Sequence, residues 1–199
     1  MTRTLRHLTL LLALLAFASA VFAHRDDQYL QATLVAIEPT GVRLHINLTP
    51  GVAVAEQVLA QIDRDRDGRI SKNEAAVYAQ LLKGDLTLRI DGRKSELKLI
   101  GSDFVPPAEL RTGAGTMQME FSAISGLLAT GPHKLSLDNR HLTTISVYLI
   151  NAVQPRFATV QITRQKRNQN QSAGEIEFTF QPLRPKIAVS DFSSSASHK

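Results

Sequence analysis

The chain has no cysteine and no tryptophan, and only three tyrosines and eight phenylalanines among its 199 residues. The lack of cysteine excludes disulfide bonds, a cysteine nucleophile and thiolate metal sites. The scarcity of aromatic side chains argues against a large aromatic binding platform. Hydrophobic residues make up 43% and charged residues 21%, ordinary proportions for a globular protein that buries a core.

Motifs of catalysis and of nucleic-acid binding are absent as well. No serine lies in a nucleophile-elbow pattern, and no glycine-rich loop follows a strand and opens a helix. The net charge of +5 is a mild excess, and the basic run 164–167 lies beside a polar stretch, which indicates a solvated turn. We therefore expect a protein that is not an enzyme and that does not bind nucleic acid.

Beyond its N-terminus, the chain also lacks an apolar run that approaches the roughly 18 residues of a membrane span. At the N-terminus, two arginines precede a short apolar run at 8–17, and small residues lead up to Ala20 and Ala23. This order is typical of a secretory signal peptide, residues 1–23, with cleavage after Ala23 or Ala20. We expect a periplasmic or secreted protein with no membrane span after cleavage. Without disulfides, such a protein depends on its core or on a bound metal for stability.

Most of the remaining sequence has the period-two alternation of half-buried strands. Turn signals such as Asp91-Gly92 separate the segments, and Leu97 and Leu99 would continue the strand that returns from this turn. The pattern predicts an antiparallel β-sandwich over residues 24–181, followed by a mobile tail at 182–199. The expected strands are 29–37, 42–48, 86–90, 97–99, 117–123, 133–137, 143–150, 157–163 and 176–180.

Residues 51–83 interrupt the β pattern with a helical insert. Apolar residues recur at every fourth position in its first part, and a second helical run at 71–83 stops at Gly84. We expect a helix–loop–helix between the second and third strands. Its predicted apolar faces comprise Val54, Val58 and Ile62 in the first helix and Val77, Leu81 and Leu82 in the second.

The loop between these helices, residues 63–74, places oxygen-bearing groups at the positions where calcium loops carry their ligands. Gly68 stands at the sixth position, where the backbone must turn sharply. The apolar Ile70 would hold the loop against the core, whereas the basic side chains of Arg64, Arg66 and Lys72 occupy non-ligand positions. A solvated acidic turn would not sort its charges in this way. The predicted metal ligands are Asp63, Asp65, Asp67, the backbone carbonyl of Arg69, Ser71 and Glu74.

On these residues, segment 52–83 resembles the EF-hand calcium-binding family. The resemblance implies one bound Ca²⁺, with Glu74 contributing both carboxylate oxygens. EF-hands usually occur in pairs, but no second loop follows: Asp91-Gly92 lacks the other ligands, and Asp138-Asn139 lacks both the glycine and the glutamate. We therefore expect a solitary hand.

A second resemblance extends over residues 24–153. The expected signal peptide, the early strand pair, the Asp91-Gly92 hairpin and the stretch Leu-Asp-Asn-Arg-His…Ser-Val-Tyr-Leu-Ile-Asn-Ala look like the extracytoplasmic front domain of HupE/UreJ-type nickel/cobalt transporters. Those domains precede membrane helices, which this sequence lacks. The resemblance implies a role beside metal handling at the cell envelope, with an envelope protein or a metal transporter as partner.

Histidine offers an alternative metal chemistry. Cleavage after Ala23 would make His24 the first residue, and its amino group and imidazole together could chelate Cu²⁺. Asp138 and His141 could complete such a site. The alternative to calcium binding is thus a periplasmic copper-, nickel- or cobalt-binding or delivery module. Of the other histidines, His45 is expected on the solvated face of a strand and His133 in a turn.

Export can be tested by mass. Protein isolated from the envelope of cells that express the full chain should lack about 20 or 23 N-terminal residues, because the signal-peptide pattern directs cleavage there. Intact-mass spectrometry measures this directly. Recovery of full-length protein from the cytoplasm would contradict the prediction.

Overall fold

A computed structural model describes residues 27–124, 126 and 128–182. The expected signal peptide at 1–23, the residue His24, and all but the first residue of the expected tail at 182–199 lie outside these residues. No helix within the described part of the chain is long and apolar enough to cross a membrane.

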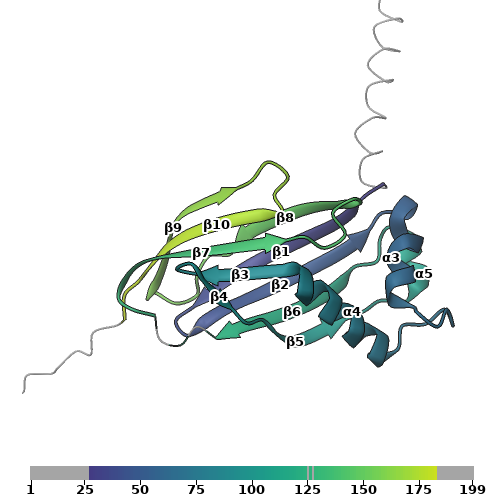
Figure 1. Ribbon diagram of the computed structural model, residues 1–199, viewed down its shortest axis with the longest axis horizontal. Coiled ribbons are helices and arrows are strands. Elements are labelled where there is room, and N and C mark those ends of the chain that lie inside the picture. Colours follow the sequence, from purple (N-terminus) through teal and green to yellow (C-terminus); the bar gives the residue numbers. More distant parts are fainter. Residues whose placement is uncertain (1–26, 125, 127, 183–199) are drawn as a thin grey trace, which may run out of the picture.

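Within the described residues, ten strands form two five-stranded sheets that face each other (Figure 1). The first sheet has the order β5 (Lys98–Asp103), β6 (Met117–Ile124), β2 (Gly41–Pro50), β1 (Tyr29–Glu38), β8 (Ser146–Ala152). The second has the order β4 (Arg93–Ser95), β3 (Leu86–Ile90), β7 (Gly131–Asn139), β10 (Ala173–Phe180), β9 (Val160–Arg167). The predicted fold class, a mainly β sandwich with a helical insert, is confirmed.

The core fills the space between the two sheets. Alternate residues of each inner strand are buried, as on β2, where Leu44, Ile46 and Leu48 are fully buried while His45 between them is exposed. Phe121 of β6 and Phe178 of β10 contribute large rings to the same core. Each such side chain contributes about 1.5–3 kcal/mol through burial.

The pairing of β1 with β8 departs from the expected all-antiparallel sandwich. These two strands run parallel, with Tyr29 opposite Ser146 and Val35 opposite Ala152. The alternation of apolar and polar residues assigns faces to a strand but says nothing about its direction, so the sequence pattern contained no signal for this pairing.

The predicted Asp91-Gly92 turn is present, but the strand that follows it is shorter than expected. Both turn residues have positive φ, 50° and 80°, and they join β3 to β4. Leu97 and Leu99 do not continue that returning strand, because β4 ends at Ser95 and β5 pairs with β6 in the other sheet. The chain thus crosses between the sheets immediately after a three-residue strand.

Two further segments differ from their predictions. The basic run 164–167 forms the end of β9 rather than a turn. His133 lies within β7, as the expected strand 133–137 implied, and not in a turn; its Nδ1 is 2.7 Å from Asp91 Oδ2. A five-residue helix, α5 (Pro107–Arg111), packs near the insert and had no periodic signal because it is little more than one turn long.

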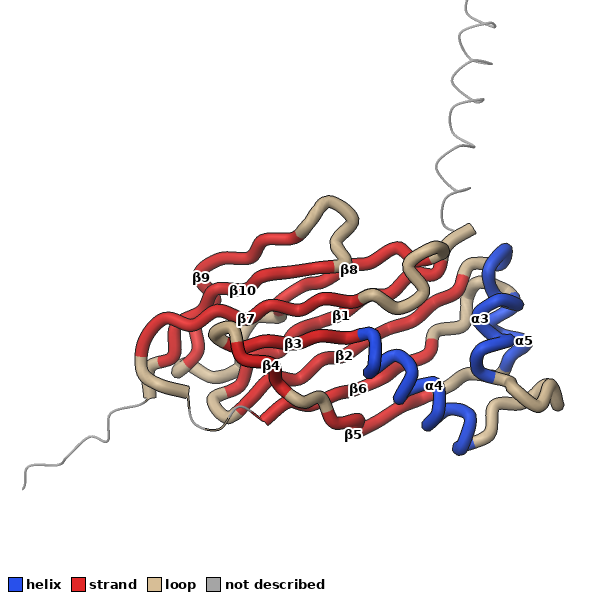
Figure 2. The backbone as a smooth tube through the Cα atoms, viewed as in Figure 1, coloured by secondary structure: helices blue, strands red, loops and turns tan. Residues whose placement is uncertain are grey.

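The helical insert lies between β2 and β3, as expected. It comprises a short 3₁₀ turn, η2 (Val52–Val54), followed by helices α3 (Ala55–Ile62) and α4 (Lys72–Asp85) at one end of the sandwich (Figure 2). The predicted apolar face of α3 is confirmed, since Val54, Val58 and Ile62 are all buried.

The predicted apolar face of α4 is wrong in part. Val77 and Leu81 are 39% and 44% exposed, and only Leu82 of the three is buried. The helix instead buries the i, i+4, i+8 series Glu74, Tyr78 and Leu82. Two of these three side chains are polar, so hydrophobic periodicity could not identify the face.

A chain of buried polar groups attaches α4 to the sandwich. His141 is fully buried; its Nδ1 is 2.8 Å from Asp85 Oδ2, and its Nε2 is 3.0 Å from the Tyr78 hydroxyl, which is 2.8 Å from the Tyr29 hydroxyl. Because the Asp85 carboxylate only accepts, Nδ1 of neutral His141 carries the proton and Nε2 accepts from Tyr78. Tyr78 in turn accepts from Tyr29. Burial lowers the pKa of His141, and the opposing influence of Asp85 does not cancel that effect.

This burial predicts a pH dependence of stability. The pKa of His141 is lower in the folded state than the roughly 6.5 of an unfolded histidine. The contribution of the neutral, buried His141 to the free energy of unfolding is therefore complete above about pH 6.5 and is lost as pH falls through the folded pKa. The slope from one proton is at most about 1.4 kcal/mol per pH unit. Denaturant unfolding from pH 7.5 to 5 should show that the free energy of unfolding falls more steeply in the wild type than in His141→Gln. His45→Gln, at an exposed histidine, is the control and should behave as the wild type does. Equal slopes in the wild type and His141→Gln would contradict the assignment.

Candidate metal centre

The loop between α3 and α4 projects from one end of the molecule (Figures 1 and 2). Its first residue, Asp63, ends α3, where its N–H donates to the Leu59 carbonyl at 2.8 Å. Its last part opens α4 with a capping box, in which Ser71 Oγ accepts from the Glu74 N–H and Glu74 accepts from the Ser71 N–H. Both ends of the loop are therefore held by the helices that flank it.

Three of the predicted ligands come together in this loop. Carboxylate oxygens of Asp63, Asp65 and Asp67 all lie within 4.8 Å of one another. Among the residues that the structure describes, no other set of three or more histidine, aspartate or glutamate side chains has this arrangement. Three carboxylates at such separations repel one another unless a cation or hydrogen-bond donors lie between them.

Backbone donors satisfy one oxygen of each aspartate. The N–H of Gly68 donates to Asp63 Oδ2 at 3.1 Å, that of Asp67 to Asp65 Oδ1 at 3.1 Å, and that of Arg69 to Asp67 Oδ1 at 2.8 Å. The second oxygen of each carboxylate has no backbone donor among the described residues.

The remaining oxygen of Asp63 is the exceptional atom of the site. The Asp63 side chain is only 8% exposed, and its Oδ1 is buried with no hydrogen-bond partner among the described residues. Leaving a buried acceptor unsatisfied costs about 1–3 kcal/mol, and more for a charged group. A cation seated against Oδ1 would remove this cost.

Glu74 is buried but is not one of the gathered carboxylates. Its Oε2 accepts from the N–H and the hydroxyl of Ser71 at 2.9 and 2.8 Å, and its Oε1 accepts from the Arg64 N–H at 2.8 Å. The bonds from Ser71, followed by that from Arg64, lower the pKa of Glu74 and keep it ionised at neutral pH. Glu74 thus closes the two ends of the loop, and its role as a bidentate ligand remains a prediction.

The other predicted ligands are placed less specifically. Ser71 uses its hydroxyl as the helix cap, and Arg69 uses its N–H within the loop. The predicted ligand roles of the Ser71 side chain and the Arg69 carbonyl are not tested by these contacts. Ile70 packs against the core and Gly68 has a φ of 79°, as the loop pattern predicted for both residues.

The alternative histidine site loses one of its predicted members. Both ring nitrogens of the fully buried His141 are already engaged, by Asp85 and Tyr78, so neither is available to a copper ion. His24 lies outside the described residues. The polar chain through His141 was not predicted, since its members come from β1, α4 and the segment after β7, and no sequence spacing connects them.

Comparisons with known proteins add no relative to this picture. No family model matches the chain, and no curated protein matches its sequence. The assignment of the loop therefore depends on its own residues and geometry.

Backbone strain at Arg66 provides a test of the loop conformation. Arg66 has a φ of 60°, a left-handed conformation that costs a non-glycine residue about 1–2 kcal/mol. Arg66→Gly should therefore be more stable than Arg66→Ala by about 1 kcal/mol, because both remove the same side-chain charge and only glycine relieves the strain.

Arg64 supplies the matched control. It does not share the positive φ, so Arg64→Ala should be more stable than Arg64→Gly by about 0.5–1 kcal/mol, which reverses the order found at Arg66. Urea unfolding of the four variants in chelator measures both differences. The same order at both positions would show that the loop does not adopt this backbone.

Proposed function

We propose that this protein binds one Ca²⁺ through the loop at residues 63–74. The observation that carries the proposal is the buried, unpartnered Oδ1 of Asp63 beside the carboxylates of Asp65 and Asp67. The proposed ligands are Asp63, Asp65, Asp67, the backbone carbonyl of Arg69, Ser71 and Glu74.

The chemistry of these donors favours calcium over other cations. All are oxygen atoms, which suit hard cations, whereas copper and zinc sites usually contain imidazole or thiolate ligands. Magnesium requires a small, rigid octahedral site and releases its water reluctantly. A loop that supplies up to four carboxylates, a carbonyl and a hydroxyl matches the larger and more flexible coordination of calcium.

The packing of the two helices supports a stabilising role for the ion. In calcium sensors the helix pair opens and exposes an apolar groove. Here the inward faces of α3 and α4 belong to the same core as the sandwich, through Val58 and Ile62 on one helix and Leu82 on the other. Opening the pair would expose that core and break the chain from Tyr78 to His141. Calcium binding is therefore proposed to fasten the insert to the sandwich.

The proposed setting is an exported, non-enzymatic protein. A solitary loop has no partner loop to preorganise it, so its affinity is expected in the weak range of extracellular modules, roughly 10⁻⁴–10⁻³ M. That range suits a compartment in which calcium is abundant, which agrees with the predicted signal peptide. At a hundredfold excess over Kd, binding adds about 2.7 kcal/mol to the free energy of unfolding.

Calorimetry and thermal melting test this function. Wild-type protein should release or absorb heat on titration with millimolar CaCl₂, and its Tm should rise relative to protein in chelator. Asp63→Asn and Glu74→Gln should each lose most of the binding, since each removes a charged oxygen from a buried ligand. Arg69→Ala is the matched control within the loop and should bind as the wild type does, because only its backbone carbonyl is used. Absence of both heat and a Tm shift in the wild type would refute the proposal.

A further inference from the structure

The calcium loop carries an outer layer of positive charge. Three basic side chains lie at non-ligand positions, and a fourth belongs to Arg69, whose backbone carbonyl alone is a proposed ligand. We call these four side chains the cationic rim: Arg64, Arg66, Arg69 and Lys72. All four residues are exposed. None of them forms an ion pair with any residue that the structure describes.

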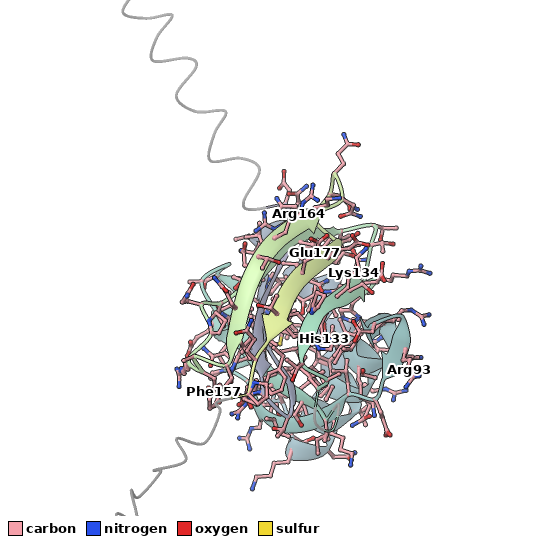
Figure 3. All side chains as sticks on the ribbon, turned by 90° about the vertical axis from the view of Figure 1, so that its left-hand side faces the viewer. Arg93, His133, Lys134, Phe157, Arg164 and Glu177 are labelled. Carbon is pink, nitrogen blue, oxygen red and sulfur yellow. The ribbon has the colours of Figure 1, made fainter. Side chains whose placement is uncertain are left out.

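Some basic side chains elsewhere on the molecule have acidic partners. On the second sheet, seen from the end of the molecule remote from the loop, Glu177 lies between Lys134 and Arg164 in the strand register (Figure 3). Lys134 Nζ is also 2.9 Å from Glu175 Oε1. Near the insert, Arg111 Nε is 2.6 Å from Glu56 Oε1. The rim differs from these in gathering four exposed cations within residues 64–72, none of which has an ion-pair partner among the described residues.

Calcium would change the net charge of this loop. The four basic side chains are balanced by four acidic ones, Asp63, Asp65, Asp67 and Glu74, so the loop without an ion is neutral overall. Asp63 and Glu74 are buried, whereas the other two acids and the four bases are exposed. An ion bound to the acids adds two positive charges, so the loop as a whole becomes cationic.

We propose that the calcium-loaded loop docks through the cationic rim onto an anionic phospholipid surface, and that the calcium-free loop does not. This inference rests on the proposed function, because calcium supplies the change of charge. Arginine guanidinium groups pair well with the phosphates of lipid headgroups, and the rim contains three of them. The loop projects from the end of the molecule, so a flat surface can meet it without contacting the sandwich (Figure 2).

The composition of the loop favours lipid over other polyanions or a protein. Protein interfaces have a desolvated apolar centre, but the only apolar side chain of the loop, Ile70, packs against the protein's own core. Single-stranded nucleic acid requires aromatic side chains for stacking, and the loop contains none. Association with the phosphates of an anionic membrane requires only exposed basic side chains near the membrane surface.

The expected size of the effect follows from the number of charges. Each arginine or lysine near an anionic membrane strengthens association about fivefold, so the two charges of the ion should strengthen it about 25-fold. Loss of three rim cations should weaken it about a hundredfold. Both effects should diminish as salt is raised from low ionic strength to 0.5 M, because exposed charges are screened.

Vesicle co-sedimentation of the full-length chain, purified after removal of its signal peptide if cleavage occurs, tests the inference. Vesicles of phosphatidylglycerol and phosphatidylcholine are compared with pure phosphatidylcholine, each in calcium and in chelator. The rim variant is Arg64→Gln, Arg66→Gln and Lys72→Gln combined, which leaves every proposed ligand in place. The matched control removes the same charge from the sandwich, as Arg93→Gln, Arg164→Gln and Lys166→Gln. Glu74→Gln in calcium shows whether free ions alone bridge protein and lipid, and each variant is also titrated with calcium by calorimetry.

The inference is supported by three results together. The wild type and the sandwich variant bind phosphatidylglycerol vesicles in calcium and not in chelator. The rim variant and Glu74→Gln do not bind these vesicles in calcium, although the rim variant still binds calcium. It is overturned if the rim variant sediments as the wild type does, if pure phosphatidylcholine binds equally well, or if soluble polyphosphate at equal phosphate concentration competes completely. If calorimetry shows that the wild type binds calcium but the protein does not bind vesicles, only the docking inference is overturned. If calorimetry shows no heat of calcium binding in the wild type, the proposed function is overturned.

Discussion

One narrow face of α4 connects the loop at residues 63–74, a buried polar chain and the hydrophobic core. Glu74, Tyr78 and Leu82 succeed one another at every fourth position and are all buried. Glu74 closes the loop by accepting from Arg64 and Ser71, Tyr78 joins Tyr29 and His141, and Leu82 packs in the core. The helix therefore cannot move without breaking contacts of all three kinds, which is why the insert behaves as part of the sandwich.

The two buried carboxylates of the insert are stabilised in different ways. Glu74 accepts hydrogen bonds at both of its oxygens, which is the usual condition for a buried charge. Among the described residues, Asp63 has a donor for Oδ2 only, and its Oδ1 is buried without one. This asymmetry supports the proposed cation site more than the count of acidic residues does, since exposed acids such as Asp65 and Asp67 are common on protein surfaces.

Local signals predicted those features whose causes lie within a few residues. Strand alternation identified the two faces of β2. The pair Asp91-Gly92 identified the β3–β4 hairpin, because few other residue pairs accept positive φ at both positions. Prediction was wrong where contacts over a long sequence separation decide the outcome. Leu97 and Leu99 do not return along the hairpin, and β5 pairs in the other sheet. On α4, Tyr78 faces inward, whereas Val77 and Leu81 are exposed.

The sequence by itself determined the spacing of the acidic residues in the loop, the glycine at its turn and the placing of the four basic residues between them, because all of these are covalent facts within twelve positions. Only the tertiary structure decided the environment of three groups. Within the described part of the chain, Asp63 Oδ1 is buried without a partner and the cationic rim forms no ion pair. His141 is enclosed by α4 and β1. Burial and pairing depend on which distant segments pack together. The β1–β8 pairing joins residues more than a hundred positions apart, and local pattern carries no information about such contacts.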